Sequence, residues 1–249
     1  MTAAFAGKTV LVTGGAAGLG RAYALRFGGE GAHLILADID EAGMAETKAL
    51  VEGVGGTAEC HRCDMSSETD IQALGGVSDK LDVLINNAGL HMGEIARGFF
   101  GLGMAKWQYF YAVNVFGPLL LAEALRPALK AAKGLIINKS SMASYQPQTA
   151  YGITKASLNV FTHAMAAQFG ANEIRCVAIA PGLMETPAAK DGVADENWER
   201  IKAMQAVKRQ GTAEDIANLG YFLASDEGSF INNQVILCDG GNQMRGFRI

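Results

Sequence analysis

The chain has 249 residues, of which 49% are hydrophobic, 18% are charged and five are prolines, and its formal net charge at pH 7 is −4. This length and composition suit one compact domain over residues 1–249 and leave no long segment too polar to fold. The 21 lysines and arginines are scattered, which argues against a basic surface for nucleic acid or anionic lipid, and the apolar runs are too short to span a bilayer. We therefore expect a cytoplasmic protein with no nucleic-acid or membrane partner.

Seven short runs rich in Val, Ile and Leu predict the strands of one sheet. The runs are nearly continuous in apolar residues, as in Val83-Leu84-Ile85, whereas a sheet with one wet face would alternate apolar and polar residues. We therefore expect a parallel sheet of about seven strands with both faces covered. The predicted strands are residues 8–13, 33–38, 57–62, 81–86, 134–139, 174–180 and 234–238.

Amphipathic stretches between these runs predict helices. Thr212, with Glu214 and Asp215 after it, gives the last of them a capped start. Alternating strands and helices, joined by right-handed crossovers, form a doubly wound α/β fold of the Rossmann type, which binds ligands beyond the carboxyl ends of its strands. The predicted helices are residues 19–29, 41–52, 68–75, 104–130, 150–169 and 213–224.

A glycine-rich segment follows the first predicted strand and leads into the first helix. It reads Thr13-Gly14-Gly15-Ala16-Ala17-Gly18-Leu19-Gly20. Glycines let the backbone approach a pyrophosphate closely, and the helix N-terminus offers unpaired N–H groups and the positive end of its dipole. An ordinary turn between strand and helix is the alternative interpretation, because a lone glycine-rich loop is a weak signal.

An acidic residue, Asp38, ends the second predicted strand and is followed by Ile39. A carboxylate at this place accepts hydrogen bonds from the adenosine ribose hydroxyls and repels a 2′-phosphate. No Arg or Lys lies inside the glycine-rich loop or directly after Asp38 to neutralise such a phosphate. We expect NAD as the cofactor, although Asp38 could also cap the helix predicted from residue 41.

Cysteine usage gives no sign of a metal centre or a disulfide framework. Four cysteines are too few for a framework in a chain with a core of this size. Cys60 and Cys63 have the spacing of a zinc or redox pair, but no second ligand pair exists. We expect free thiols and no metal.

The motifs, in their order along the chain, resemble the short-chain dehydrogenases/reductases, and the resemblance covers essentially the whole chain. It implies an NAD-dependent member similar to the 3-oxoacyl-carrier-protein reductases and secondary alcohol dehydrogenases. The motifs are the Thr-Gly-x-x-x-Gly-x-Gly loop, Asp64, Asn86-Asn87-Ala88-Gly89, Asn114, Asn138-Lys139-Ser140-Ser141, Tyr151-x-x-x-Lys155, Pro181-Gly182-Leu183-Met184-Glu185-Thr186 and Asp239-Gly240-Gly241.

The resemblance also implies where NAD would bind. Asp64 and Met65 would face the adenine, the segment up to Gly89 would line the ribose and steady the sheet, and Thr186 would meet the nicotinamide. The expected cofactor-binding residues are Gly14, Ala17, Gly18, Leu19, Gly20, Asp38, Ile39, Asp64, Met65, Asn87, Ala88, Gly89, Tyr151, Lys155, Pro181, Gly182, Met184 and Thr186.

Tyr151 and Lys155 share one face of a predicted helix because they are four residues apart. An unperturbed tyrosine, with a pKa of about 10, is too weak a base at neutral pH, but a nearby ammonium can lower that pKa by about 1–3 units. The resemblance implies that Tyr151 transfers the proton, Ser141 holds the substrate oxygen, and Asn114 holds a water that links Lys155 to solvent. A Tyr/Lys pair can also be only a surface patch.

The segment from Ser141 to Tyr151 is shorter than in most members of this family. Ser140 and Ser144 therefore remain alternatives to Ser141 as the serine that holds the substrate oxygen. His91 lies close enough to the Asn-Asn-Ala-Gly segment to touch substrate, but we interpret it as a surface histidine without a role.

Residues 183–207 predict a mobile lid over the substrate, with Pro187 and Gly192 where it could bend. Its charges are mixed in sign and include no arginine pair for an anion, so we expect a neutral, largely apolar small-molecule substrate. The alternative is that Trp198, Ile201 and Met204 form one face of a short helix packed on the domain.

Three further expectations concern function and assembly. The sequence favours hydride transfer between NAD(H) and a secondary alcohol or ketone. An NAD-binding sensor and a non-redox enzyme on the same scaffold are the alternatives. The resemblance implies a homotetramer, paired through the helices at 104–130 and 150–169.

Overall fold

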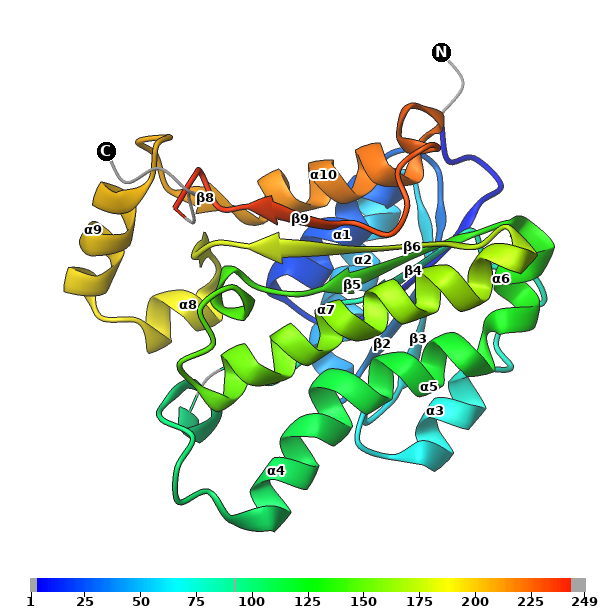
Figure 1. Cartoon of the computed structure of the whole chain (residues 1–249). Helices are drawn as coiled ribbons and strands as arrows, with labels where there is room; N and C mark the ends of the chain where they lie inside the picture. Colours follow the sequence, from blue (N-terminus) through cyan, green and yellow to red (C-terminus); the bar gives the residue numbers. More distant parts are fainter. Residues whose placement is uncertain (1–3, 92, 243–249) are drawn as a thin grey trace.

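The computed structural model describes residues 4–91 and 93–242 and contains a seven-stranded parallel sheet in the order β3-β2-β1-β4-β5-β6-β9 (Figure 1). The predicted fold class is confirmed, and each of the seven predicted strands appears within two residues of its expected bounds. The strands are β1 (Thr9–Thr13), β2 (His33–Asp38), β3 (Thr57–Arg62), β4 (Val83–Asn86), β5 (Leu135–Lys139), β6 (Arg175–Pro181) and β9 (Val235–Cys238).

Helices cover both faces of the sheet, because successive strand residues point to opposite sides. Val10 and Val12 pack toward α1 (Gly18–Gly28), α2 (Glu41–Gly53) and α10 (Ala213–Ala224). Leu11, between them, packs toward the other layer. That layer contains α3 (Glu68–Leu74), α5 (Gly117–Ala124), α6 (Arg126–Ala132) and α7 (Ala150–Phe169).

The predicted single helix over residues 104–130 is wrong. The structure has α4 (Gly103–Tyr111), a π-helical turn (Ala112–Phe116), then α5 and α6, and the chain bends by 61° between Ala124 and Arg126. Two prolines explain the breaks. Pro118 has no N–H to donate to the carbonyl of Asn114 four residues earlier, and Pro127 interrupts the helix in the same way at α6. Asn114 therefore lies in a widened turn instead of a regular helix.

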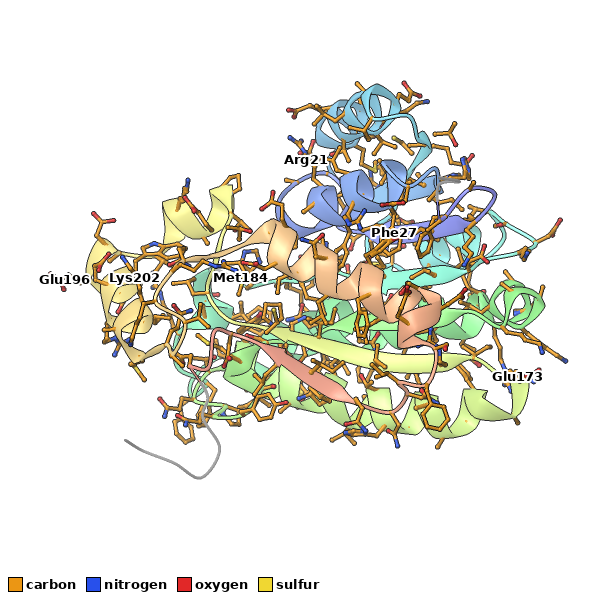
Figure 2. The ribbon with its side chains drawn as sticks, turned by 90° about the horizontal axis from the view of Figure 1, so that it is seen from above. Arg21, Phe27, Glu173, Met184, Glu196 and Lys202 are labelled. Carbon is orange, nitrogen blue, oxygen red and sulfur yellow. The ribbon has the colours of Figure 1, made fainter. Side chains whose placement is uncertain are left out.

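The segment after β6 forms a small substructure at the carboxyl ends of the strands. It contains β7 (Met184–Glu185), which pairs with β8 (Gly211–Thr212), and the helices α8 (Pro187–Gly192) and α9 (Asp195–Met204). Seen from above, α9 with Glu196 and Lys202 forms the end of the molecule opposite Glu173 (Figure 2). The predicted lid residues thus stand at the edge where ligands bind in this fold.

Short helical turns complete the connections between these elements. They are Gly93–Ala96, Met142–Ser144, Gly170–Asn172 and Asp226–Gly228. Among the described residues, no single helix has both the length and the apolar character needed to cross a bilayer; α4 to α6 would pass only as a bent pair, judged by length and composition.

Candidate active site

A cavity of about 760 Å³ lies along the carboxyl ends of the strands, and a volume of several hundred Å³ is typical of small-molecule and cofactor sites. Most of the residues predicted to form the site line it: Gly14, Ala17, Gly18, Leu19, Asp38, Ile39, Asp64, Met65, Asn87, Ala88, Gly89, Ser141, Tyr151, Pro181, Gly182, Met184 and Thr186. Gly20, Asn114 and Lys155 are not among the lining residues, and each supports a residue that is.

The glycine-rich loop passes very close to the start of α1. A Cβ on Gly20 would lie 1.9 Å from the carbonyl oxygen of Gly14, so only glycine fits there. Gly18 has a φ of +54°, in the left-handed region that favours glycine. The residue before α1, Ala17, has no side chain that could cap the helix, which leaves the first-turn N–H groups facing the cavity. This arrangement fits a pyrophosphate.

Asp38 is fixed by three backbone N–H groups. One carboxylate oxygen accepts from the N–H of Ala16 at 3.1 Å, and the other accepts from Ile39 at 2.7 Å and Asp40 at 3.1 Å. The helix cap considered as an alternative role for Asp38 belongs to Asp40, which accepts from the N–H of Gly43 at 3.0 Å. Asp38 therefore joins the glycine-rich loop to the end of β2 and presents its carboxylate to the cavity.

The asparagine pair at the end of β4, Asn86 and Asn87, holds neighbouring strands together. Asn86 donates to the side-chain oxygen of Asn138 on β5 at 2.9 Å. Asn87 donates to the carbonyl oxygens of Thr13 and Gly14, at 2.9 and 3.0 Å. This part of the expected cofactor site is thus scaffold as well as cavity wall.

The side chains of Tyr151 and Lys155 lie in one cleft because α7 begins at Ala150 and so places both residues on the same face of its first turns. Thr149 caps α7 by accepting from the N–H of Gly152 at 3.1 Å. The Lys155 Nζ lies 5.8 Å from the centre of the Tyr151 ring and donates to the carbonyl oxygen of Lys139 at 2.8 Å. Lys155 has only 1% of its surface exposed, so it is a core residue and does not belong to the surface patch that was considered as an alternative.

Asn114 is held by the backbone of Leu90. Its side-chain oxygen accepts from the N–H of Leu90 at 2.8 Å, and its amide donates to the Leu90 carbonyl oxygen at 3.0 Å and to Thr154 Oγ1 at 3.1 Å. Asn114 is completely buried. The π-helical turn therefore anchors the loop after β4 beside α7.

The hydrogen bonds of the three candidate serines differ. Ser141 lines the cavity and hydrogen-bonds to Tyr151. The hydroxyl of Ser144 donates to the Ser141 carbonyl oxygen at 2.7 Å and accepts from Asn159 at 2.9 Å, and Ser140 donates to Ser144 at 3.4 Å. The geometry thus favours Ser141 for contact with a substrate, with Ser144 supporting its backbone.

Burial dominates the titration of the Tyr151 and Lys155 pair. It raises the pKa of Tyr151, and the hydrogen bond with Ser141 opposes that rise. Burial, with a smaller contribution from the charge of Lys139, holds the pKa of Lys155 well below its usual range. The expected lowering of the Tyr151 pKa by Lys155 does not appear in the protein alone, where burial raises this pKa and only the hydrogen bond with Ser141 opposes the rise.

The predicted lid contributes part of the cavity wall. Leu183, Met184, Ala189, Val193 and Ile201 line the cavity. Trp198 donates its indole N–H to the Val193 carbonyl oxygen at 3.2 Å, and Met204 is 56% exposed, so neither side chain supplies the apolar contact expected from the sequence. The short helix of the alternative interpretation does form, as α9, and Ile201 lies on the side of α9 that faces the cavity.

Several residues that were not predicted as site residues also line the cavity, and three of them are basic. Lys139, at the end of β5, and Arg200, on α9, both line it. His91 also lines the cavity, although it was interpreted as a surface histidine without a role, and its ring Nδ1 lies 3.3 Å from the Gly89 carbonyl oxygen. The signal for Lys139 was present in Asn138-Lys139-Ser140-Ser141, since a lysine ends an otherwise apolar buried strand.

A doubly wound parallel sheet, with a glycine-rich loop at one end of the cavity and Ser141 and Tyr151 at the other, and with Lys155 beside the Tyr151 ring, defines a dinucleotide-binding oxidoreductase. A family model described as enoyl-(acyl carrier protein) reductase matches residues 14–243. The chain belongs to the short-chain dehydrogenase/reductase family, and members of it that resemble this chain act on CH–OH groups with a nicotinamide cofactor.

Three comparisons illustrate this membership. The 7alpha-hydroxysteroid dehydrogenase of Escherichia coli (strain K12) is 31% identical over an alignment of 243 residues that covers 94% of this chain and 94% of its own. A solved 7 alpha-hydroxysteroid dehydrogenase complexed with NADH and 7-oxo glycochenodeoxycholic acid is 30% identical, has a TM-score of 0.90 and is matched over 96% of both chains. A solved relative from Beutenbergia cavernae with bound NADP at low occupancy is 29% identical, has a TM-score of 0.87 and is matched over 97% of this chain and 99% of its own.

Proposed function

We propose that this protein transfers a hydride between NAD(H) and a secondary alcohol or ketone, with Tyr151 as the general acid and base. The observation that carries the proposal is one buried cleft in which Ser141 hydrogen-bonds to Tyr151 and Lys155 lies beside the same ring. The cavity extends from this cleft to Asp38 and the uncapped start of α1, which fits a dinucleotide.

Tyr151 and Ser141 would have different roles in the proton transfer. In the oxidation direction, Tyr151 takes the proton of the substrate hydroxyl; in reduction it returns that proton to the carbonyl oxygen. Ser141 holds the substrate oxygen by a hydrogen bond and so fixes it near the phenol. A bound nicotinamide supplies the hydride acceptor or donor.

Lys155 and Asn114, which are both buried, would support proton transfer by Tyr151. A cationic Lys155 favours the phenolate and so opposes the effect of burial on the Tyr151 pKa, as does the positive charge of an oxidised nicotinamide. Asn114 would hold a water that connects Lys155 to solvent. Its fixed side chain, bonded to Leu90 and Thr154, supports this positioning role.

Asp38 supports the choice of NAD over NADP. Its carboxylate is held in the cavity by backbone N–H groups, where it would accept from the ribose hydroxyls and repel a 2′-phosphate. Ile39, directly after it, offers no positive charge. The related 7 alpha-hydroxysteroid dehydrogenase was solved with NADH, which agrees with this choice.

The substrate would be a small molecule with a largely apolar body, covered by the lid at residues 183–207. The lid residues that line the cavity support this, since Leu183, Met184, Val193 and Ile201 are all apolar. Closing such a lid would exclude water from the reacting atoms.

The assembly and location that we propose are a homotetramer in the cytoplasm. Apolar side chains left exposed on the layer that contains α4, α5 and α7 support the assembly, with Val160 at 68% exposure. Four free cysteines support a reducing compartment.

The experiment that tests the function is an assay of the purified protein with NAD⁺ and a panel of secondary alcohols, read by the absorbance of reduced nicotinamide. We expect turnover of at least one alcohol, faster with NAD⁺ than with NADP⁺. Binding of NAD⁺ without turnover of any alcohol or ketone would contradict the proposal and favour a sensor or a non-redox enzyme.

A further inference from the structure

An unpaired cation, Lys139, faces the catalytic end of the cavity. It is the last residue of β5 and lines the cavity together with Ser141 and Tyr151. Its charge contributes to the lowered pKa of both His91 and Lys155. In the part of the chain that the structure describes, no ion pair or hydrogen bond is formed by its ammonium, while its backbone carbonyl accepts from Lys155.

The surroundings of Lys139 are basic. The titratable groups that its charge affects are His91 from the loop after β4 and Lys155 from α7, while Tyr151 from α7 and Arg200 from α9 line the same cavity. The cavity-lining carboxylates lie at or just after the ends of β2 and β3, and they are Asp38, Asp40 and Asp64. Since β2 is three strands away from β5, the backbones of these two strands are about 14 Å apart by strand spacing.

Two acidic side chains on the segments that follow β4 and β6 are paired with lysines. Glu94, in the turn after β4, bonds to Lys106 at 2.6 Å, and Glu185 on β7 bonds to Lys190 at 2.7 Å. Lys139 therefore stands in a cleft that also holds Lys155, without a described carboxylate to balance its charge. Burying an uncompensated charge is costly, so a cleft of this kind favours an anionic ligand.

We infer that Lys139 binds a carboxylate of the substrate, so that the protein acts on hydroxy acids and the corresponding keto acids. This inference rests on the proposed function and adds a substrate class to it. The Tyr151 hydroxyl and Ser141 hold the carbinol oxygen, Lys139 holds the carboxylate, and the apolar lid covers the carbon chain between or beside them. One ammonium matches the single charge of a carboxylate.

The expectation of a neutral substrate was drawn from the charges of residues 183–207 alone. Lys139 lies outside that segment, on the sheet, so its charge did not enter the expectation. We still expect a largely apolar substrate, but one that carries a single negative charge instead of being neutral.

The test uses 2-, 3-, 4- and 5-hydroxyhexanoate, each paired with its neutral methyl ester. The series moves the carboxylate along the chain relative to the carbinol carbon, and each ester removes the charge by adding one methyl group. We expect kcat/KM for at least one acid to exceed that for its ester by about 10- to 100-fold, the range of a charge-assisted hydrogen bond. Esters that equal or outperform the acids at all four positions would overturn the inference while leaving the proposed function intact.

Two variants assign the preference to Lys139. Lys139→Met should reduce the acid-to-ester ratio of kcat/KM to about one, and Lys139→Arg should restore most of it. Arg200→Met is the matched control, because it removes the other unpaired lining cation from the lid. A ratio that collapses in Arg200→Met and persists in Lys139→Met would overturn the assignment.

The pH dependence of the ratio supplies an independent readout. Burial lowers the pKa of Lys139 to about 8. The ammonium exists below this pKa, so the acid-to-ester ratio should be highest below pH 8 and fall as the pH rises through about 8. Titration of Tyr151 affects acid and ester alike and cancels in the ratio. In Lys139→Arg the guanidinium stays charged, and the ratio should persist at higher pH.

Binding of hexanoate separates the inference from the proposed function. Hexanoate and neutral hexanamide are titrated calorimetrically into the NAD⁺-loaded protein and into its Lys139→Met variant. Stronger binding of hexanoate, lost in the variant, is expected whether or not any hydroxyhexanoate is turned over. If no compound is turned over, that result keeps the anion site and rejects the proposed function, whereas equal binding of both probes rejects the anion site.

Discussion

At the scale of single residues, the site depends on side chains whose hydrogen bonds leave them little freedom. The Asp38 carboxylate is held by the N–H groups of Ala16, Ile39 and Asp40. Lys155 is held by the carbonyl oxygen of Lys139. Such fixed groups are already oriented before a ligand arrives, so less binding energy is lost in ordering them.

Asp38 leads to a prediction about cofactor choice. The double variant Asp38→Ser and Ile39→Arg removes the carboxylate and adds a cation, so the ratio of kcat/KM for NAD⁺ over NADP⁺ should fall by at least about tenfold. The single variant Asp38→Asn is the control, since it keeps the shape of the side chain and removes its charge. Equal efficiency of NAD⁺ and NADP⁺ in the unmodified protein would show that Asp38 does not select the cofactor.

Which residues gather at the site was largely predictable from the sequence, whereas their electrostatics were not. Motif order and strand ends brought Asp38, Ser141 and Tyr151 to one cavity, as predicted. The titration of Tyr151 was not predictable, because desolvation depends on every atom packed around the phenol. Lys139 was missed for a related reason: its motif position is visible in the sequence, but the lack of a nearby carboxylate is not.

At the scale of elements, predictions succeeded where local pattern and tertiary packing agree. The helices α7 and α10 have the bounds predicted, and both begin at a threonine cap. The segment at 104–130 failed, because its apolar pattern continues across Pro118 and Pro127 while the backbone cannot. The strands β7 and β8 were not predicted, because two residues each are too few to show a hydrophobic period in the sequence.

The cap of α10 can be tested by its effect on stability. The Thr212 hydroxyl accepts from the N–H of Asp215, and the Asp215 side chain accepts in return from the N–H of Thr212. Thr212→Ala should therefore cost about 1 kcal/mol, lowering the melting temperature by about 2–4 °C for a domain of this size.

The Thr212→Ser variant is the matched control, because it keeps the hydroxyl and loses only a methyl group. Differential scanning calorimetry compares the two variants with the unmodified protein. An unchanged melting temperature in Thr212→Ala would show that the capping box does not contribute to stability.

At the scale of the whole molecule, one helical layer carries apolar side chains that the described chain leaves exposed. Val160 on α7 is 68% exposed, Tyr109 on α4 is 49% exposed and Phe116, just before α5, is 44% exposed. These elements lie on the same side of the sheet (Figure 1). A contact with a second copy of the chain would cover them.

This surface gives a prediction about assembly. The unmodified protein should have the mass of a tetramer by light scattering at micromolar concentration. Val160→Glu would bury a charge in the contact and should give a smaller species, while Val160→Ala should keep the assembly. A monomeric mass for the unmodified protein would contradict the proposed tetramer.

The central claim, that Tyr151 transfers the proton in an NAD-dependent oxidation of alcohols, is tested most directly by Tyr151→Phe. The measurement pairs the turnover of the best alcohol from the panel with the binding of NADH, followed by fluorescence. We predict that kcat falls by about 10²- to 10⁴-fold, because only the oxygen that carries the proton is lost, while the Kd for NADH changes little. A variant that keeps a large share of the kcat at neutral pH would contradict the account.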